Sequence, residues 1–233
     1  MSLLIVSSMA VLNRLPKMLR FGSDLHDVAS PGTPFFDLRA AKQLSEGAVP
    51  LHHAASHPGL AVSAAVAHRL LSVLGLSVDL KDVCAVIAPM SAAISCVVTY
   101  LLGKEISGDS AVGMLSAELL ALLPASTAAT VAGSFGAQGL AVSPLLVSML
   151  YYLRAIKQNR PRDSAACAAV SGVCLLLTSL TCRAYSLFLS YLFPLHVAYM
   201  LCTGKHSANV WATYTTLYSV GRNSEKSALL RLY

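Results

Sequence analysis

Residues 83–102 read VCAVIAPMSAAISCVVTYLL, an unbroken run without a charged side chain. A helix of about 20 apolar residues is long enough to cross the hydrocarbon core of a bilayer. An apolar run of this length is typical of a membrane span and exceeds what a buried strand or core helix of a soluble domain needs. The stretch therefore predicts a membrane protein whose fold is built from α-helices.

Further apolar runs lie on both sides of this one, at residues 3–21, 111–123, 140–153, 164–180, 185–201 and 209–221. The run at 3–21 is the weakest candidate, because Arg14, Pro16, Lys17 and Arg20 interrupt it. Together the runs predict an all-α, polytopic membrane helical bundle with roughly six or seven transmembrane helices. No segment between them is large enough for a soluble domain.

The composition of the chain supports a lipid environment. Hydrophobic residues make up 55% of the 233 residues and charged residues only 12%, with a mean hydropathy of +0.63. A soluble domain of this size needs more polar surface than that. The net charge of +6 does not indicate a nucleic-acid partner, because the basic residues lie between apolar runs and form no basic stripe. Membrane lipid is the partner that this composition predicts.

Positive charge in short loops predicts the orientation of a membrane protein. Arg154, Lys157, Arg160 and Arg162 lie in one such loop, opposed only by Asp163, whereas residues 124–139 carry no charge. The basic loop is therefore expected in the cytosol and residues 124–139 on the other side. Counting back one helix also places Lys104 and Glu105 in the cytosol.

The side on which the N-terminus lies depends on residues 58–76. If this segment spans the membrane, the N-terminus is not cytosolic. If it is an interfacial helix, the N-terminus is cytosolic and residues 22–82 form one large external loop. His68 and Arg69 lie in mid-segment and favour the second alternative, because an ionisable pair is disfavoured at the bilayer centre.

Several short strings of the sequence resemble one known family in their order and spacing. They include Pro34-Phe35-Phe36-Asp37-Leu38-Arg39-Ala40, Pro58-Gly59-Leu60, Asp82-Val83-Cys84, Val131-Ala132-Gly133-Ser134-Phe135 and Pro194-Leu195-His196. The chain is similar to the N-terminal third of the catalytic subunit of eukaryotic oligosaccharyltransferase. This resemblance implies a multi-pass protein of the endoplasmic reticulum membrane with a cytosolic N-terminus. It also implies a long lumenal first loop, in agreement with the charge pattern. The apolar runs and this topology together predict a first transmembrane helix at 1–21, a lumenal loop at 22–82 with an interfacial helix near 58–76, a helical bundle at 83–221 and a polar tail at 222–233.

The resemblance also implies a chemistry, protein N-glycosylation, in which an oligosaccharide moves from dolichyl diphosphate to an Asn side chain. The family uses Mn or Mg, and its metal-binding acids match Thr33, Gly136 and Gln138 of this chain. A hard divalent cation needs carboxylate oxygens, which these residues do not supply. We therefore expect no cofactor, no metal site and no catalytic residue. Whether the chain is an enzyme stays open, and the family's C-terminal domain that reads the acceptor sequence has no counterpart here.

Three residues are weaker candidates for a site. Asp27 lies in the first loop and, by the resemblance, aligns with the family Glu two positions before a metal-binding Asp, which itself matches Thr33 or, with another gap, Ala29. A single carboxylate holds a divalent ion poorly. Arg183 could clamp a diphosphate, and His57 belongs to a histidine group with His52 and His53. For each of them an ordinary role in a solvated loop or at the membrane interface is the competing interpretation.

The sequence therefore leaves two main hypotheses for the function and a third with less support. The chain is a truncated family member that is catalytically inactive by itself, or it is a non-catalytic membrane scaffold or assembly subunit of a larger complex. In either case its partners could be other oligosaccharyltransferase subunits or a dolichol-linked lipid. A small transporter has less support, because we expect no acid inside the spanning helices.

Overall fold

The computed structural model describes residues 2–14, 39–44, 57–75, 78–132, 135–158 and 160–202, with residues 211, 214, 215 and 219. The expected all-α fold is confirmed, and these residues contain no strand. The principal helices are α1 (Ser2–Leu12), α4 (Pro58–Val73), α5 (Leu80–Ser107), α6 (Ser110–Leu122), α7 (Pro124–Ala129), α8 (Ala137–Lys157), α9 (Pro161–Thr181) and α10 (Arg183–Cys202).

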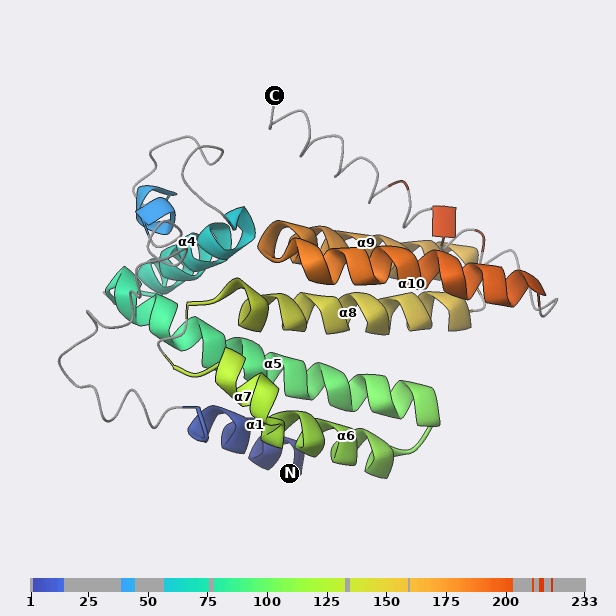
Figure 1. Cartoon of the computed structure of the whole chain (residues 1–233), viewed down its shortest axis with the longest axis horizontal. Helices are drawn as coiled ribbons and strands as arrows, with labels where there is room; N and C mark the ends of the chain where they lie inside the picture. The colour runs from blue at the N-terminus through green and yellow to red at the C-terminus, as the bar shows by residue number, and fades with distance from the viewer. Residues whose placement is uncertain are drawn as a thin grey trace.

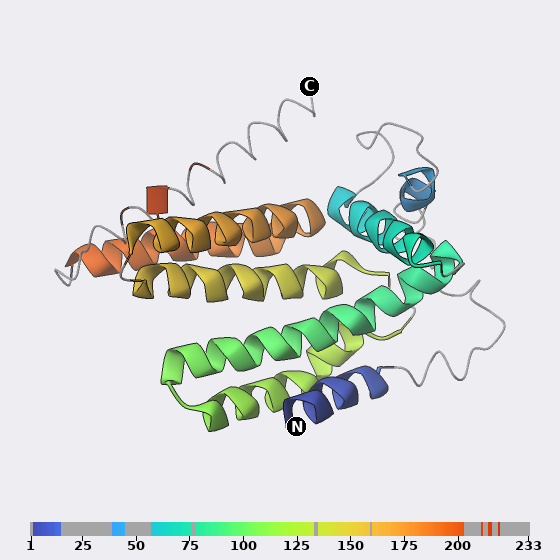
Figure 2. The same cartoon turned by 180° about the vertical axis from the view of Figure 1, so that it is seen from behind.

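The long helices lie side by side in a fixed order across the molecule (Figures 1 and 2). Helices α1 and α6 pack on one side of α5, and α8 packs on the other side. Helix α9 covers α8, and α10 packs on α9 and α8. Helix α4 joins the N-terminal part of α5 to the end of α9. One end of the bundle therefore gathers α4, α7 and the first turns of α5, α8 and α10 (Figure 1).

A tight connection makes α5 and α6 an antiparallel pair. Gly108 adopts a left-handed conformation with φ 77°, and its N–H donates to the Lys104 carbonyl, which ends α5. Asp109 then caps α6, because its carboxylate accepts the Ala111 N–H at 3.0 Å. Gly113 allows close packing, since a methyl group there would lie 2.6 Å from the Tyr100 carbonyl oxygen.

Small hydroxyl-bearing residues hold α8 against α9. The Ser148 hydroxyl donates to the Ser171 carbonyl at 3.0 Å, and the Ser171 hydroxyl donates to the Ser148 carbonyl at 2.8 Å. The Ser164 hydroxyl donates to the Ala155 carbonyl at 2.9 Å, and all four residues are fully buried. Small residues of this kind let helix backbones approach closely inside a membrane.

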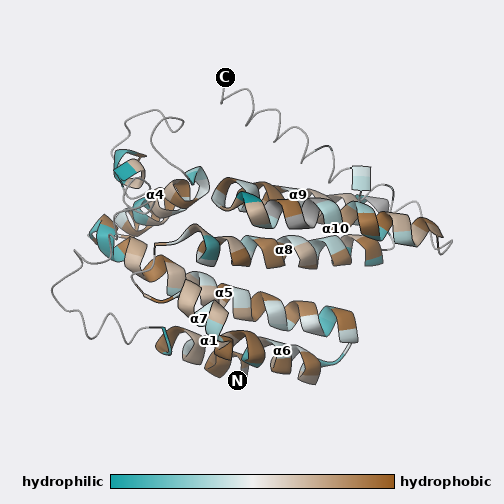
Figure 3. Cartoon of the chain, viewed as in Figure 1, coloured by the Kyte–Doolittle hydropathy of each residue, from teal (hydrophilic) through white to brown (hydrophobic). Residues whose placement is uncertain are grey.

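Three described helices are long and apolar enough to cross a membrane: Leu80–Ser107, Ala137–Lys157 and Arg162–Thr181. Shorter apolar helices lie at Leu3–Leu12, Pro58–Val73, Ser110–Leu122 and Tyr191–Cys202. Figure 3 shows that hydrophobic residues are distributed along most of the helices of the bundle. The expected count of six or seven spanning helices therefore stays a prediction.

The N-terminal segment differs from the expected single run over residues 1–21. Helix α1 ends at Leu12, and Asn13 and Arg14 form a turn. The expected interfacial segment does contain a helix, α4, over Pro58–Val73. The boundaries at 21 and 22 and the tail at 222–233 lie outside the described residues.

Candidate functional site

The segment from Thr130 to Gly139, called the motif segment below, joins α7 to α8. It contains Gly136 and Gln138, two of the residues that match the family's metal-binding acids. Phe135 anchors it, because this ring is buried in a cluster with Ala40, Leu60 and Cys84. The cluster draws together residues 39–44, α4 and the first turns of α5. The motif segment therefore lies at the end of the bundle where these elements meet (Figure 1).

Arg14 holds the start of this segment to α1. Its Nε donates to Thr130 Oγ1 at 2.6 Å, its Nη1 to the Ala10 carbonyl at 2.6 Å and its Nη2 to Ser126 Oγ at 3.1 Å. The Ala132 N–H in turn donates to the Arg14 carbonyl at 2.9 Å. Arg14 is fully buried, and no described carboxylate pairs with it. Its charge is therefore stabilised by hydroxyl and carbonyl dipoles.

The other end of the segment is fixed through Gly139. The Ser91 hydroxyl of α5 donates to the Gly139 carbonyl at 3.2 Å. A methyl group at Gly139 would overlap the carbonyl oxygen of Ala129 and lie 3.0 Å from Thr130 Cγ2. Only glycine fits this close approach of α8 to the end of α7. The backbone that carries the motif is therefore held at both of its ends.

The two metal positions on this backbone lack carboxylates. Gly136 precedes α8 in an extended conformation, and a methyl group there would meet no atom within 4 Å. Gln138 lies in the first turn of α8 and is exposed. The described residues contain no group of three His, Cys, Asp or Glu side chains that could hold a metal ion. Glycine and an amide do not fit the Mn or Mg that the family resemblance implies.

The weaker candidates are not all placed. Asp27 and Thr33 lie outside the described residues. His57 directly precedes α4, and Arg183 is the exposed first residue of α10. A methyl group at Gly59 would lie 2.7 Å from the Thr181 backbone nitrogen, so the start of α4 packs on the end of α9. This contact brings the neighbourhoods of His57 and Arg183 to the same end of the bundle.

The opposite end of the bundle carries the paired charges. Glu105 of α5 accepts from Arg154 at 3.3 Å and from Lys157 at 3.1 Å, both at the end of α8. The Lys157 ammonium also donates to the Glu105 carbonyl. The two loops that the charge pattern assigns to the cytosol thus lie together, away from the motif segment.

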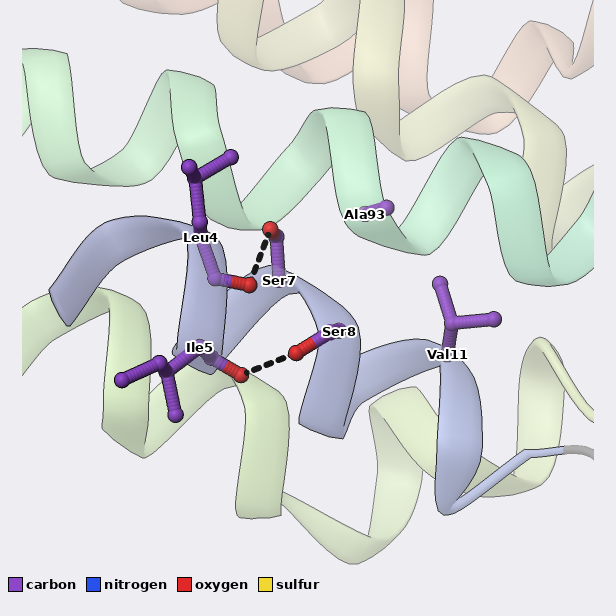
Figure 4. Close-up of a pocket in the computed structure, with 6 residues that line it drawn as sticks. All are labelled: Leu4, Ile5, Ser7, Ser8, Val11 and Ala93. Atoms are coloured by element: carbon purple, nitrogen blue, oxygen red, sulfur yellow. Dashed lines mark hydrogen bonds between the residues drawn. The ribbon is translucent and has the colours of Figure 1, made fainter. Parts of the chain in front are cut away.

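A shallow depression lies between α1 and α5 (Figure 4). Leu4, Ile5, Ser7, Ser8, Val11 and Ala93 line it. The Ser7 and Ser8 hydroxyls donate to the carbonyls of Leu4 and Ile5, at 3.0 and 2.8 Å. Because both donors are used within the helix, this surface offers a ligand mainly apolar contact.

Glu118 is the residue that the sequence reasoning missed. It lies in α6 among apolar residues, so the expectation that no spanning run contains an acid is wrong for residues 111–123. A single acid between Leu115 and Leu119 was the available signal. The side chain is exposed on the outside of the bundle, which gives no support to a transport pathway through the bundle.

Comparison with known proteins gives a family match over most of the chain. Residues 31–227 match the family described as Oligosaccharyl transferase STT3, N-terminal. The chain is 28% identical to the dolichyl-diphosphooligosaccharide–protein glycosyltransferase subunit stt3 of Schizosaccharomyces pombe, over 94% of this chain and 30% of that protein. It is 31% identical to subunit STT3B of Oryza sativa subsp. japonica, over 94% of this chain and 31% of that protein.

A solved structure shares the fold. The oligosaccharyltransferase of Archaeoglobus fulgidus in complex with Zn and sulfate superposes with a TM-score of 0.73 at 17% identity. The match covers 96% of this chain and 30% of the archaeal one. The chain thus spans about 30% of the length of the relatives that it matches.

Proposed function

The chain belongs to the oligosaccharyl transferase STT3 family, and from this premise we propose that it is a non-catalytic subunit of a protein complex in the endoplasmic reticulum membrane. Catalysis in this family, by the resemblance given above, rests on acids at the positions of Thr33, Gly136 and Gln138. The chain does not transfer oligosaccharide by itself, because these residues cannot bind a divalent cation.

One observation carries the proposal. Hydrogen bonds and packing hold the motif segment in place, whereas glycine and glutamine occupy the positions of the family's metal-binding acids. Arg14 and Ser91 hydrogen-bond its two ends, Phe135 is buried and Gly139 packs on Ala129. Supports of this kind stabilise the bundle whether or not a metal is bound. The combination favours a role in assembly, with other oligosaccharyltransferase subunits or a dolichol-linked lipid as partners.

An activity assay tests the first half of the proposal. The full chain, purified from membranes and reconstituted in lipid with Mn²⁺, is given dolichyl-diphosphate oligosaccharide and a peptide with an Asn-X-Thr acceptor. We expect no glycopeptide above a blank without protein. A complete oligosaccharyltransferase preparation is the positive control. Transfer by the chain alone would overturn the proposal.

A native pull-down tests the second half. The tagged chain is expressed at its natural level, solubilised in mild detergent and isolated, and the eluate is identified by mass spectrometry. We expect oligosaccharyltransferase subunits in stoichiometric amounts, and none with an unrelated tagged membrane protein of similar size. A stable chain that elutes without any of these subunits would contradict a role in that complex.

A further inference from the structure

Glu118 is a carboxylate on the outer surface of an apolar helix. Its side chain is exposed, and it makes no hydrogen bond or ion pair within the described part of the chain. On the same face of α6, Leu115, Leu119 and Leu122 are 57%, 61% and 68% exposed. Helix α6 packs on α1, α5 and α7, and it lies at the edge of the bundle (Figure 1).

The depth of Glu118 follows from its neighbour Ala117. Ala117 packs in one buried cluster with Cys96, which lies near the middle of α5. Helix α5 is the longest of the helices able to span a membrane. Because α6 runs back along α5 from Asp109, Glu118 lies level with the middle of that span. A bilayer at this depth holds no water to solvate a carboxylate, and acids in such positions pair with another polar group.

We propose that the outer face of α6 binds a membrane-spanning helix of a different protein, which presents a Lys or Arg side chain to Glu118. The inference rests on the membrane placement of α6 in the proposed function and names the chemistry of one partner. Leucine side chains supply the packing surface, and an interhelical hydrogen bond or ion pair sets the register of the partner.

A second copy of this chain does not supply the missing charge. A two-fold interface brings the same face of both copies together. Residues 110–122 contain no Lys, Arg or His, so two α6 helices would oppose acid with acid. The complementary charge therefore comes from a different helix.

Site-specific photocrosslinking in cell membranes tests the proposal. A photoreactive residue replaces Leu122 in one variant and Leu195 of α10 in the control, because each leucine is 68% exposed. We expect one defined protein adduct from position 122 and none from position 195. The crosslinked peptide should map to a membrane-spanning helix that contains Lys or Arg.

Charge exchange then decides whether Glu118 carries the contact. Glu118→Leu should lower the adduct yield about tenfold, the loss that a 1.4 kcal/mol interaction produces. Glu118→Gln, which keeps hydrogen-bonding groups, should fall between. Glu118→Lys should abolish the adduct, and Lys→Glu or Arg→Glu in the partner helix should restore it. An adduct with a second copy, an adduct with lipid only, an unchanged yield in Glu118→Leu or a partner helix without a cation would each overturn the proposal.

A labelling control distinguishes an error in the inferred partner helix from an error in the membrane placement of α6. A cysteine at position 115 is exposed to a membrane-impermeant maleimide in opened membranes. Rapid labelling would show that α6 lies outside the bilayer, which contradicts its membrane placement in the proposed function. Protection from label together with an absent adduct would overturn only the inference about the partner.

Discussion

Gly139 lies so close to Ala129 that a methyl group on its Cα would overlap the Ala129 carbonyl oxygen. The clash would be with backbone, which cannot rotate away as a side chain can. The start of α8 and the end of α7 can therefore lie this close only because residue 139 has no side chain.

Gly139→Ala should therefore destabilise the bundle, by about 2 kcal/mol or more if the helix ends must separate. The apparent Tm of the detergent-solubilised chain measures the loss. Gly136→Ala is the matched control, because its added methyl group meets open space, and it should leave the Tm within experimental error. Equal Tm values for the two variants would contradict the packing described for Gly139.

Arg14→Ala should loosen α1 from α7. It removes three hydrogen bonds and leaves the Ala10 carbonyl and the Thr130 hydroxyl with one partner fewer each. We expect a loss of about 1.5–3 kcal/mol of stability, which is the range for a hydrogen bond to a charged group. Arg14→Lys should recover only part of it, because one ammonium group cannot reach all three acceptors. Arg160→Ala, which removes an exposed loop cation, should leave the stability unchanged. A comparable loss of stability in this control would mean that the loss of a positive charge, and not the hydrogen bonds of Arg14, causes the effect.

Gly136→Asp with Gln138→Glu should restore a weak divalent-ion site without harm to the fold. Position 136 has room for the side chain, and position 138 is exposed. Two carboxylates bind such an ion weakly, so we expect a Kd on the order of 10⁻⁴–10⁻³ M for Mn²⁺. Electron paramagnetic resonance of free Mn²⁺ measures it. The Gly136→Asn variant, whose side chain has the shape of Asp without its charge, should bind no Mn²⁺. Binding of Mn²⁺ by the unaltered chain would contradict the proposed loss of the metal site.

Labelling from one side of the membrane tests the orientation. Cysteine is introduced at Ser107 or at Gln138, both exposed and at opposite ends of the bundle, in a chain with Cys182 and Cys202 replaced by Ser. In sealed microsomes an impermeant maleimide should label position 107, whereas position 138 should need the membrane to be opened. The reverse pattern would place the basic loop at 154–163 in the lumen and contradict the orientation that the charge pattern predicts.

The helices of the bundle could be predicted from the sequence, because each apolar run reports directly on burial in protein or lipid. Helices α8 and α9 cover the runs at 140–153 and 164–180 and extend a few residues beyond them. Both helices continue past the apolar runs because polar residues such as Lys157 and Asp163 can be part of a helix that extends out of the membrane. The pattern of apolar residues alone does not predict where such a helix ends.

The role of Arg14 could not be predicted in this way. In the sequence it interrupts an apolar run, and its partners Ser126 and Thr130 lie 112 and 116 residues further along the chain. Which hydroxyls would satisfy the guanidinium depends on how α7 turns back toward α1. For Glu118, the sequence shows an acid within an apolar run, but it does not show that the side chain is exposed on the outside of α6.

The separation between Arg14 and Thr130 has a consequence for biosynthesis. At about 5–20 residues per second, the ribosome completes Thr130 on the order of ten seconds after Arg14. During that interval the guanidinium has none of its α7 acceptors, Ser126 and Thr130. Of its side-chain hydrogen bonds described above, only the one to the Ala10 carbonyl can form at this stage. The other two can form only after the hairpin of α5 and α6 has been made.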